Sequence, residues 1–137
     1  MSTYNAEDWL EKVIIGFAQQ TISNFEIVIA DDGSKDSTRE TIDRLRQKTG
    51  LDIQHIWQED DGFQKCRILN KSILAAKGDY LVFTDGDCIP RADFLENHLK
   101  FREKGYFLSG GYYKLPLNIS KKITADDIKK QNCFKLS

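Results

Sequence analysis

Two short apolar runs in this chain each stop abruptly at clustered aspartates. Phe25–Ala30 is followed by Asp31 and Asp32, and Tyr80–Thr84 is followed by Asp85. Runs of this length that end at turn-forming residues are typical of buried strands. Ligands in open α/β sheets bind beyond the carboxyl ends of the strands. Carboxylates at two strand ends therefore predict a sheet with an acidic binding edge.

Segments with helical periodicity alternate with these strands up to about residue 115. This alternation predicts an α/β fold, in which a mainly parallel sheet carries helices on both faces. Two further strands are expected at Ile53–Trp57 and Phe107–Tyr113. The expected helices are Glu7–Gln20, a helix that Ser37 and Glu40 begin as a capping box and Gly50 ends, Lys65–Ala76, Pro90–Phe101 and Asp126–Gln131.

Composition narrows the class of protein. The net charge is −1 over 137 residues, so the electrostatic footprint of a nucleic-acid binder is missing and no nucleic-acid partner is expected. Cys66, Cys88 and Cys133 are dispersed, which indicates reduced thiols in a cytosolic protein rather than a disulfide framework or a zinc site. No run reaches the roughly 18 apolar residues of a membrane span, so we expect a soluble chain with no direct span.

The second acidic cluster is a candidate metal site. Residues i and i+2 of an extended segment face the same side, so Asp85 and Asp87 can converge on one ligand, and Gly86 between them permits a close approach. Paired carboxylates suit Mg²⁺ or Mn²⁺, which normally shares its coordination shell with substrate phosphates. The alternative is that these acids are helix caps and solvated loop residues. Their position directly after an apolar strand favours the metal site.

Asp31 and Asp32 leave two interpretations open. One carboxylate can accept a hydrogen bond from the base or hydroxyl of a ligand. Equally, Asp32-Gly33-Ser34 is a common turn sequence and can merely begin the next helix. The two histidines, His55 and His98, lack a metal-binding partner at helical spacing, which favours structural roles for both.

Four segments, in this order and spacing, resemble family 2 glycosyltransferases of the GT-A fold. The resemblance covers Ser2 to Tyr113, which is most of the chain. The segments are Ser2-Thr3-Tyr4-Asn5, Asn24–Ser34 (NFEIVIADDGS), Gly62–Asn70 (GFQKCRILN) and Ala76–Pro90 (AKGDYLVFTDGDCIP).

The resemblance implies a Rossmann-like GT-A domain and a specific reaction. Such enzymes transfer a sugar from a nucleoside diphosphate donor, usually a UDP-sugar, to a hydroxyl of a saccharide or glycolipid acceptor, with inversion and with Mn²⁺ or Mg²⁺. It further implies a role in polysaccharide or glycoconjugate biosynthesis, in the cytoplasm or at the cytoplasmic face of the membrane. Residues 1–115 are then the donor-binding subdomain, and the polar residues 116–137 begin an acceptor-side region.

Roles in donor binding follow from the matched motifs. Asp31 or Asp32 is expected to bind the uracil edge, with Arg67 near the base. Asp87 is the expected direct metal ligand. The remaining expected contacts are Thr3, Tyr4 and Asn5 at the nucleobase and ribose, and Asp85 with Gly86 at the ribose or the metal.

Two departures from the family pattern also carry expectations. An apolar strand normally precedes Ser2, so the sheet is expected to lack its first strand. A general base normally follows the DGD motif, but Asp126 and Asp127 look like a solvated helix start, so the base and the acceptor half are expected to be missing. Two alternatives to a working transferase follow. One is a catalytically incomplete fragment that binds donor and metal, and the other is a phosphatase-type domain with Asp85 as nucleophile.

Overall fold

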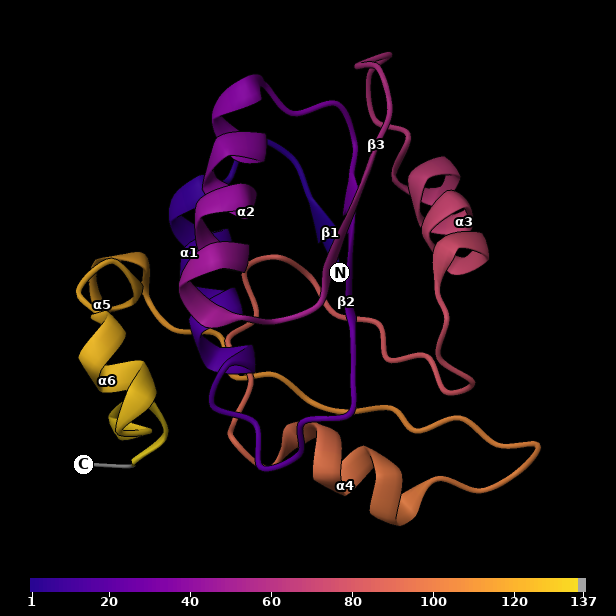
Figure 1. Ribbon diagram of the computed structural model, residues 1–137. Coiled ribbons are helices and arrows are strands. Elements are labelled where there is room, and N and C mark those ends of the chain that lie inside the picture. Colours follow the sequence, from indigo (N-terminus) through magenta and orange to yellow (C-terminus); the bar gives the residue numbers. More distant parts are fainter. Residues whose placement is uncertain (136–137) are drawn as a thin grey trace.

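Three parallel strands form the sheet in the computed structural model, which describes residues 1–135 (Figure 1). The strands are β1 (Ser2–Thr3), β2 (Ile27–Asp31) and β3 (Ile53–Trp57), and β2 lies between the other two. Thr3 pairs with Asp31, and Asp31 pairs in turn with Trp57. The carboxyl ends of all three strands therefore meet at one edge, as the sequence predicts.

Helices cover both faces of this sheet, which confirms the predicted α/β fold. In Figure 1, α1 (Glu7–Phe17) and α2 (Asp36–Thr49) lie on one side and α3 (Lys65–Ala75) on the other. The helix α4 (Phe94–Phe101) lies below the sheet, while α5 (Leu117–Ser120) and α6 (Ala125–Lys129) lie outside α1. A short 3-10 turn, Asn132–Phe134, follows. None of the helices among residues 1–135 is long and apolar enough to cross a membrane.

The core forms between β2 and the apolar face of α1. Leu10, Val13 and Ile14 recur at helical spacing on α1, and all three are fully buried. They pack with Ile29 of β2 in one cluster. The other members of the cluster are Met1, Phe17, Ile27, Ile42, Leu45, Ile53 and Leu95.

The sequence predicts the C-terminal end of α2 correctly but not its N-terminal end. Gly50 ends the helix in the left-handed conformation, with φ 69°, as expected of a terminal glycine. The capping box predicted from Ser37 and Glu40 is wrong, because Lys35 occupies the N-cap position. The Ser37 hydroxyl donates instead to the Glu7 carboxylate over 2.6 Å, so this serine joins α2 to α1.

The strand predicted at Tyr80–Thr84 is not formed. The segment is extended but meets the sheet only where Ser2 bridges to Asp85, through bonds from Ser2 N to Thr84 O (3.3 Å) and from Gly86 N to Ser2 O (2.8 Å). Each residue of a strand needs a partner residue on the neighbouring strand, and β1 offers only two. The sequence analysis expects the first strand of the sheet to be missing, and the structure retains only these two residues beside β2. An open groove of about 990 Å³ separates the rest of the segment from the start of β2.

Two further expectations are corrected. The strand predicted at Phe107–Tyr113 is not formed, because this segment has no strand beside it and the Phe107 side chain is 88% exposed. The fourth helix begins at Phe94 rather than Pro90. The residues predicted as its first turn are not helical. Their carbonyl groups bind other parts of the chain, because Thr21 N donates to Ala92 O and the Gln20 amide donates to Arg91 O.

The helix α6 begins with a capping box, which yields a test of its stability. Thr124 Oγ1 accepts from Asp127 N, and the Asp127 carboxylate accepts from Thr124 N over 3.0 Å. We expect Thr124→Ala to lower the free energy of unfolding by about 1 kcal/mol, because Asp127 N loses its acceptor and the Asp127 carboxylate loses the hydroxyl that donates to it. Urea unfolding measures this, with Ser120→Ala as a control that removes a hydroxyl outside the box. An unchanged midpoint for Thr124→Ala would contradict the assignment.

Candidate active site

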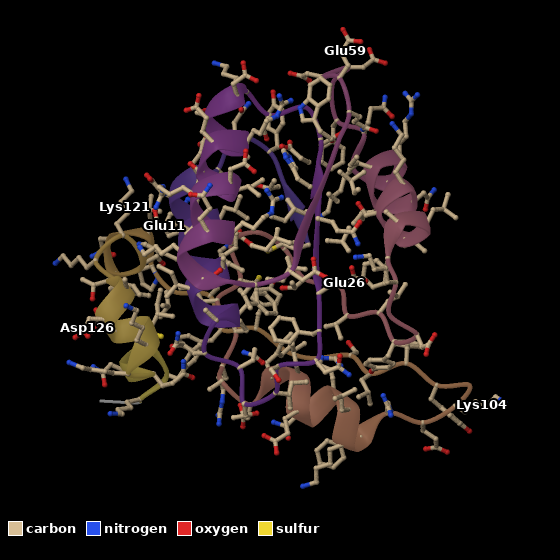
Figure 2. The ribbon with its side chains drawn as sticks, viewed as in Figure 1. Glu11, Glu26, Glu59, Lys104, Lys121 and Asp126 are labelled. Carbon is tan, nitrogen blue, oxygen red and sulfur yellow. The ribbon has the colours of Figure 1, made fainter. Side chains whose placement is uncertain are left out.

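The carboxyl edge of the sheet gathers the acidic residues that the sequence singles out. β1 lies between the two acidic strand ends, because Thr3 pairs with Asp31 while Ser2 bridges to Asp85. In Figure 2, Glu59 marks this end of the molecule, just beyond β3. The structure therefore brings the two predicted clusters to the two sides of one short strand.

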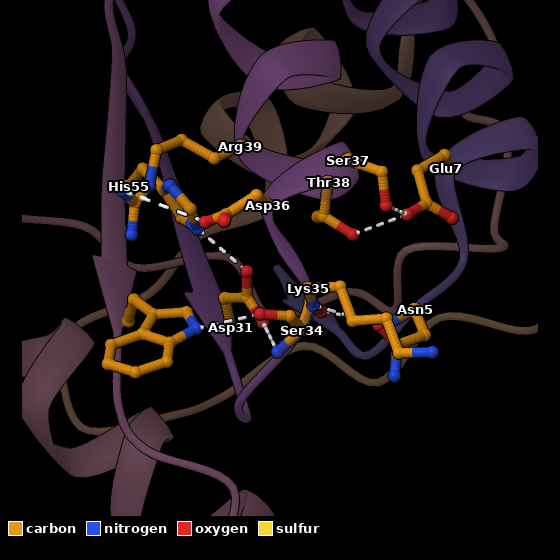
Figure 3. A network of polar contacts seen from close by, with 11 residues as sticks. Asn5, Glu7, Asp31, Ser34, Lys35, Asp36, Ser37, Thr38, Arg39 and His55 are labelled. Carbon is orange, nitrogen blue, oxygen red and sulfur yellow. Dashed lines mark hydrogen bonds and ion pairs between the residues drawn. The ribbon is translucent and has the colours of Figure 1, made fainter.

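Asp31 is fully buried, and both of its carboxylate oxygens accept hydrogen bonds (Figure 3). Ser34 N donates to Oδ1 over 2.8 Å, and His55 Nε2 lies 2.8 Å from Oδ2. Burial by itself would raise the pKa of Asp31, but the hydrogen bonds from His55 and Ser34 outweigh it and hold the pKa below its ordinary value. The predicted structural role of His55 agrees with this pairing, since its ring holds a buried carboxylate.

This lowered pKa sets the direction of an acid dependence. A carboxyl whose folded-state pKa is depressed contributes stability above its unfolded pKa, and that stability is lost as the pH falls through the folded pKa. We therefore expect the free energy of unfolding to fall with acidification below about pH 4. The slope should be smaller in Asp31→Asn, which has no carboxyl to protonate. Urea titrations at several pH values measure both slopes, and equal slopes would contradict the role of Asp31.

Asp32 is also largely buried, at 7% exposure, and is held from a different direction. Gln58 Nε2 donates to its Oδ1 over 2.6 Å, and Gln64 N donates to its Oδ2 over 2.8 Å. Each carboxylate oxygen has two lone pairs, so Asp32 keeps acceptor capacity for a ligand. Gln58 is a site residue that the sequence analysis did not identify. Its only sequence signal is its position directly after a strand.

The residues that follow β1 shape the wall next to Asp32. Asn5 has a left-handed backbone with φ 45°, its N–H donates to Ser34 Oγ, and its side-chain oxygen accepts from Lys35 N (Figure 3). Tyr4 is half exposed and donates to the Asp60 carboxylate over 2.9 Å, which raises the pKa of Tyr4. Asn5 thus fixes the turn, and Tyr4 presents an aromatic ring at the edge.

Thr3 and Gln58 each carry a polar atom that lacks a partner. Within residues 1–135, Thr3 Oγ1 and Gln58 Oε1 are the buried side-chain oxygen or nitrogen atoms without a hydrogen bond. A Cβ added at Gly86 would lie 3.5 Å from Thr3 Oγ1, so this hydroxyl lies beside the DGD motif. Burying a polar group without a partner is costly, and such a group in a binding site is accounted for by a ligand or a water.

Asp85 is held by a cation and a hydroxyl. Lys65 Nζ and Ser2 Oγ each lie 2.7 Å from Asp85 Oδ1. The Lys65 ammonium, and after it the Ser2 hydroxyl, keep the pKa of Asp85 below its ordinary value. Gly86 is buried, and a Cβ there would lie 2.7 Å from the Ser2 carbonyl oxygen, so only glycine fits against β1. Lys65 is a second site residue that the sequence analysis did not identify.

Asp87 lies exposed at the tip of the motif, where the Cys88 thiol is 3.5 Å from its Oδ1. Among the described residues, no cluster of three or more His, Cys, Asp and Glu side chains could hold a metal by itself. Two exposed carboxylates fit a divalent cation whose other ligands come from a bound substrate. Arg67 is exposed on the first turns of α3, and its side chain forms no ion pair within residues 1–135.

Comparison with known proteins decides the family. The sequence model described as "Glycosyl transferase family 2" matches residues 1–130. The chain belongs to glycosyl transferase family 2. This membership confirms the resemblance inferred from the four motifs.

Relatives in family 2 differ in how much of their length the chain covers. Chondroitin synthase from Pasteurella multocida is 36% identical over 59% of the chain, and the match spans 8% of that protein. An uncharacterized glycosyltransferase from Haemophilus influenzae is 30% identical over 99% of the chain, and the match spans 58% of it. The chain thus covers less than two thirds of the length of each.

A solved structure agrees with the fold. The mannosyltransferase PcManGT from Pyrobaculum calidifontis, in complex with GDP-Man and Mn²⁺, superposes with a TM-score of 0.66 at 27% identity. The superposition covers 73% of the chain and 30% of the mannosyltransferase. The predicted GT-A architecture is therefore confirmed for this family 2 chain.

Proposed function

We propose that this chain binds a nucleoside diphosphate sugar at the carboxyl edge of its sheet, and that the protein transfers the sugar to a hydroxyl acceptor. The observation that carries the proposal is the arrangement around β1. The unpartnered Thr3 hydroxyl lies beside Gly86, with the carboxylates of Asp32 and Asp85 on the two sides of the strand. A donor laid across this edge reaches both acids.

The nucleoside is assigned to the side of the site formed by Asp32. Of the two adjacent acids, Asp32 is the one with residual exposure, and Asp31 is fully buried and paired with His55. Asp32 therefore accepts the hydrogen bond from the base, and Asp31 holds the turn. Tyr4 borders the base with its half-exposed ring, Thr3 and Asn5 complete the ribose side, and Arg67 lies on the helix beside them.

The diphosphate is assigned to the side formed by the DGD motif. Asp87 and Asp85 would hold Mn²⁺ or Mg²⁺, which fits their oxygen chemistry and their exposure. The cation, when bound, offsets the negative charge that builds on the leaving diphosphate. Gly86 lets β1 and the motif lie in contact, so the backbone of the motif is held against β1 before the donor arrives.

The class of product follows from the relatives and stays part of the proposal. The chondroitin synthase relative supports a role in polysaccharide synthesis, and the saccharide or glycolipid acceptor belongs to the proposal. The predicted UDP donor and inversion belong to this proposal too, as does the division into a donor subdomain at 1–115 and an acceptor-side region at 116–137. The mannosyltransferase was solved with GDP-Man, so the nucleotide needs a direct comparison.

Calorimetric titration with UDP and with GDP, each with and without Mn²⁺, tests the proposal. We expect Mn²⁺-dependent binding of one nucleotide, with UDP preferred. Transfer from the matching nucleotide sugar is then assayed with saccharide acceptors. Absence of Mn²⁺-dependent binding of either nucleotide would contradict the proposal.

A second candidate function is donor binding without turnover by this chain alone. Its support is the position of Asp126 and Asp127, the acidic pair that follows the DGD motif and that the sequence analysis interprets as a solvated helix start rather than a general base. They lie on α6, which packs on the outer side of α1, and Asp127 is engaged in the capping box (Figure 2). Donor binding without detectable transfer in the same assays would favour this candidate.

A further inference from the structure

The strongest unexplained contact at the site is the ion pair of Lys65 with Asp85. The ammonium lies 2.7 Å from Asp85 Oδ1, the same oxygen that accepts from Ser2. We propose that Lys65 is a ligand of the donor diphosphate, held in place by Asp85 until the metal binds. This inference rests on the proposed function, because it takes Asp85 and Asp87 as the metal site.

A metal ion and the Lys65 ammonium compete for Asp85. A divalent cation needs the oxygens of this carboxylate, and one of them is already occupied by an ammonium. Two cations at one carboxylate repel each other, and within residues 1–135 Lys65 is the ion-pair partner of Asp85. Arrival of the metal therefore releases the Lys65 side chain from Asp85.

The Lys65 ammonium stays at the site after its release from Asp85. The backbone beside Lys65 is fixed, because Gln64 N donates to Asp32 Oδ2 and the Gln58 amide donates to Gln64 O. Only the flexible four-carbon side chain of Lys65 is free to swing. The side chain is 36% exposed, so it has room to move without disturbing the core.

The new partner of Lys65 is the diphosphate. The nucleoside diphosphate that leaves the sugar carries more negative charge than one divalent cation neutralises, and a lysine ammonium is a common phosphate ligand. The phosphates lie next to the metal, and the metal lies next to Asp85. Lys65 therefore exchanges the Asp85 carboxylate for the diphosphate, which lies within reach of the start of α3. It contributes to nucleotide binding only once metal and nucleotide are both present.

Two affinities test this role, because they should move in opposite directions. In Lys65→Met, we expect Mn²⁺ alone to bind about tenfold more tightly, since the competing cation is gone. We expect UDP in saturating Mn²⁺ to bind about tenfold more weakly, since a phosphate ligand is lost. Electron paramagnetic resonance of free Mn²⁺ measures the first affinity, and calorimetry measures the second.

Matched variants separate this role from general damage. Lys71→Met removes the same charge from an exposed position on the same helix and should change neither affinity, and Lys65→Arg should retain most of the UDP affinity. A Lys65→Met protein whose two affinities do not move in opposite directions overturns the inference. If the unaltered chain fails to bind UDP in Mn²⁺, the proposed function fails and this inference with it. If it binds and only the Lys65 result disagrees, the inference fails alone.

Discussion

Replacing Asp87 by Ala is expected to abolish Mn²⁺-dependent binding of UDP, with a loss of roughly 100-fold or more in affinity, about 3 kcal/mol. The physical reason is the small number of ligands. The described residues offer no cluster of three metal-binding side chains, so the exposed carboxylates of Asp85 and Asp87 have no substitute. Calorimetry with and without Mn²⁺ measures the loss.

The control for Asp87→Ala is Asp79→Ala. Asp79 is an exposed aspartate at the far end of the extended segment that leads to the motif, so its removal changes the net charge equally. We expect its Mn²⁺-dependent affinity to be unchanged. Residual binding of UDP without Mn²⁺ should also be the same in both variants, because base and ribose contacts lie elsewhere. Metal-dependent binding that survives in Asp87→Ala would rule out Asp87 as a metal ligand.

Gly33→Ala is expected to destabilise the chain by about 3 kcal/mol and to weaken nucleotide binding. The backbone of Gly33 has φ 97°, which an alanine adopts only with strain. The added Cβ would also lie 2.6 Å from Asp60 Cα, so the loop after β3 would have to move. Asp60 is the partner of the Tyr4 hydroxyl, and that movement would disturb the proposed nucleoside wall.

Gly50→Ala provides the matched control. Gly50 also has a left-handed backbone, with φ 69°, but nothing lies within 4 Å of an added Cβ. Its replacement should therefore cost only the backbone strain, about 1 kcal/mol. Urea unfolding compares the two, and UDP titration should show a loss only for Gly33→Ala. Equal destabilisation by the two variants would mean that the contact with Asp60 carries no energy.

Local patterns predict the elements that local contacts determine. The strand Ile53–Trp57 and the start of α1 at Glu7 agree with the sequence analysis, because each carries its own periodicity and has a partner. Tyr80–Thr84 has an equally strong strand pattern and still forms no strand. Its ladder depends on how many residues β1 supplies, and that is a property of another part of the chain.

The site shows the same division between local and distant information. The position of Asp85 and Asp87 after an apolar run predicts the acidic edge correctly. The sequence leaves Asp31 and Asp32 equivalent, because their difference arises from His55 and Gln58, which reach them from the neighbouring strand and the loop after it. Lys65 lies within the Gly62–Asn70 motif, but its pairing with Asp85 is not predicted from the sequence, since Asp85 is 20 residues away.

The start of α3 touches both acidic clusters at once, and this has a thermodynamic consequence. Gln64 N holds Asp32, and Lys65 next to it holds Asp85. A ligand that changes the contact at one cluster and thereby alters the contact at the other couples the two binding free energies, and such coupling is reciprocal. Under this arrangement, the factor by which Mn²⁺ tightens a nucleoside contact at Asp32 equals the factor by which that contact tightens Mn²⁺. We therefore expect the two halves of the proposed donor site to bind their ligands cooperatively through the start of α3.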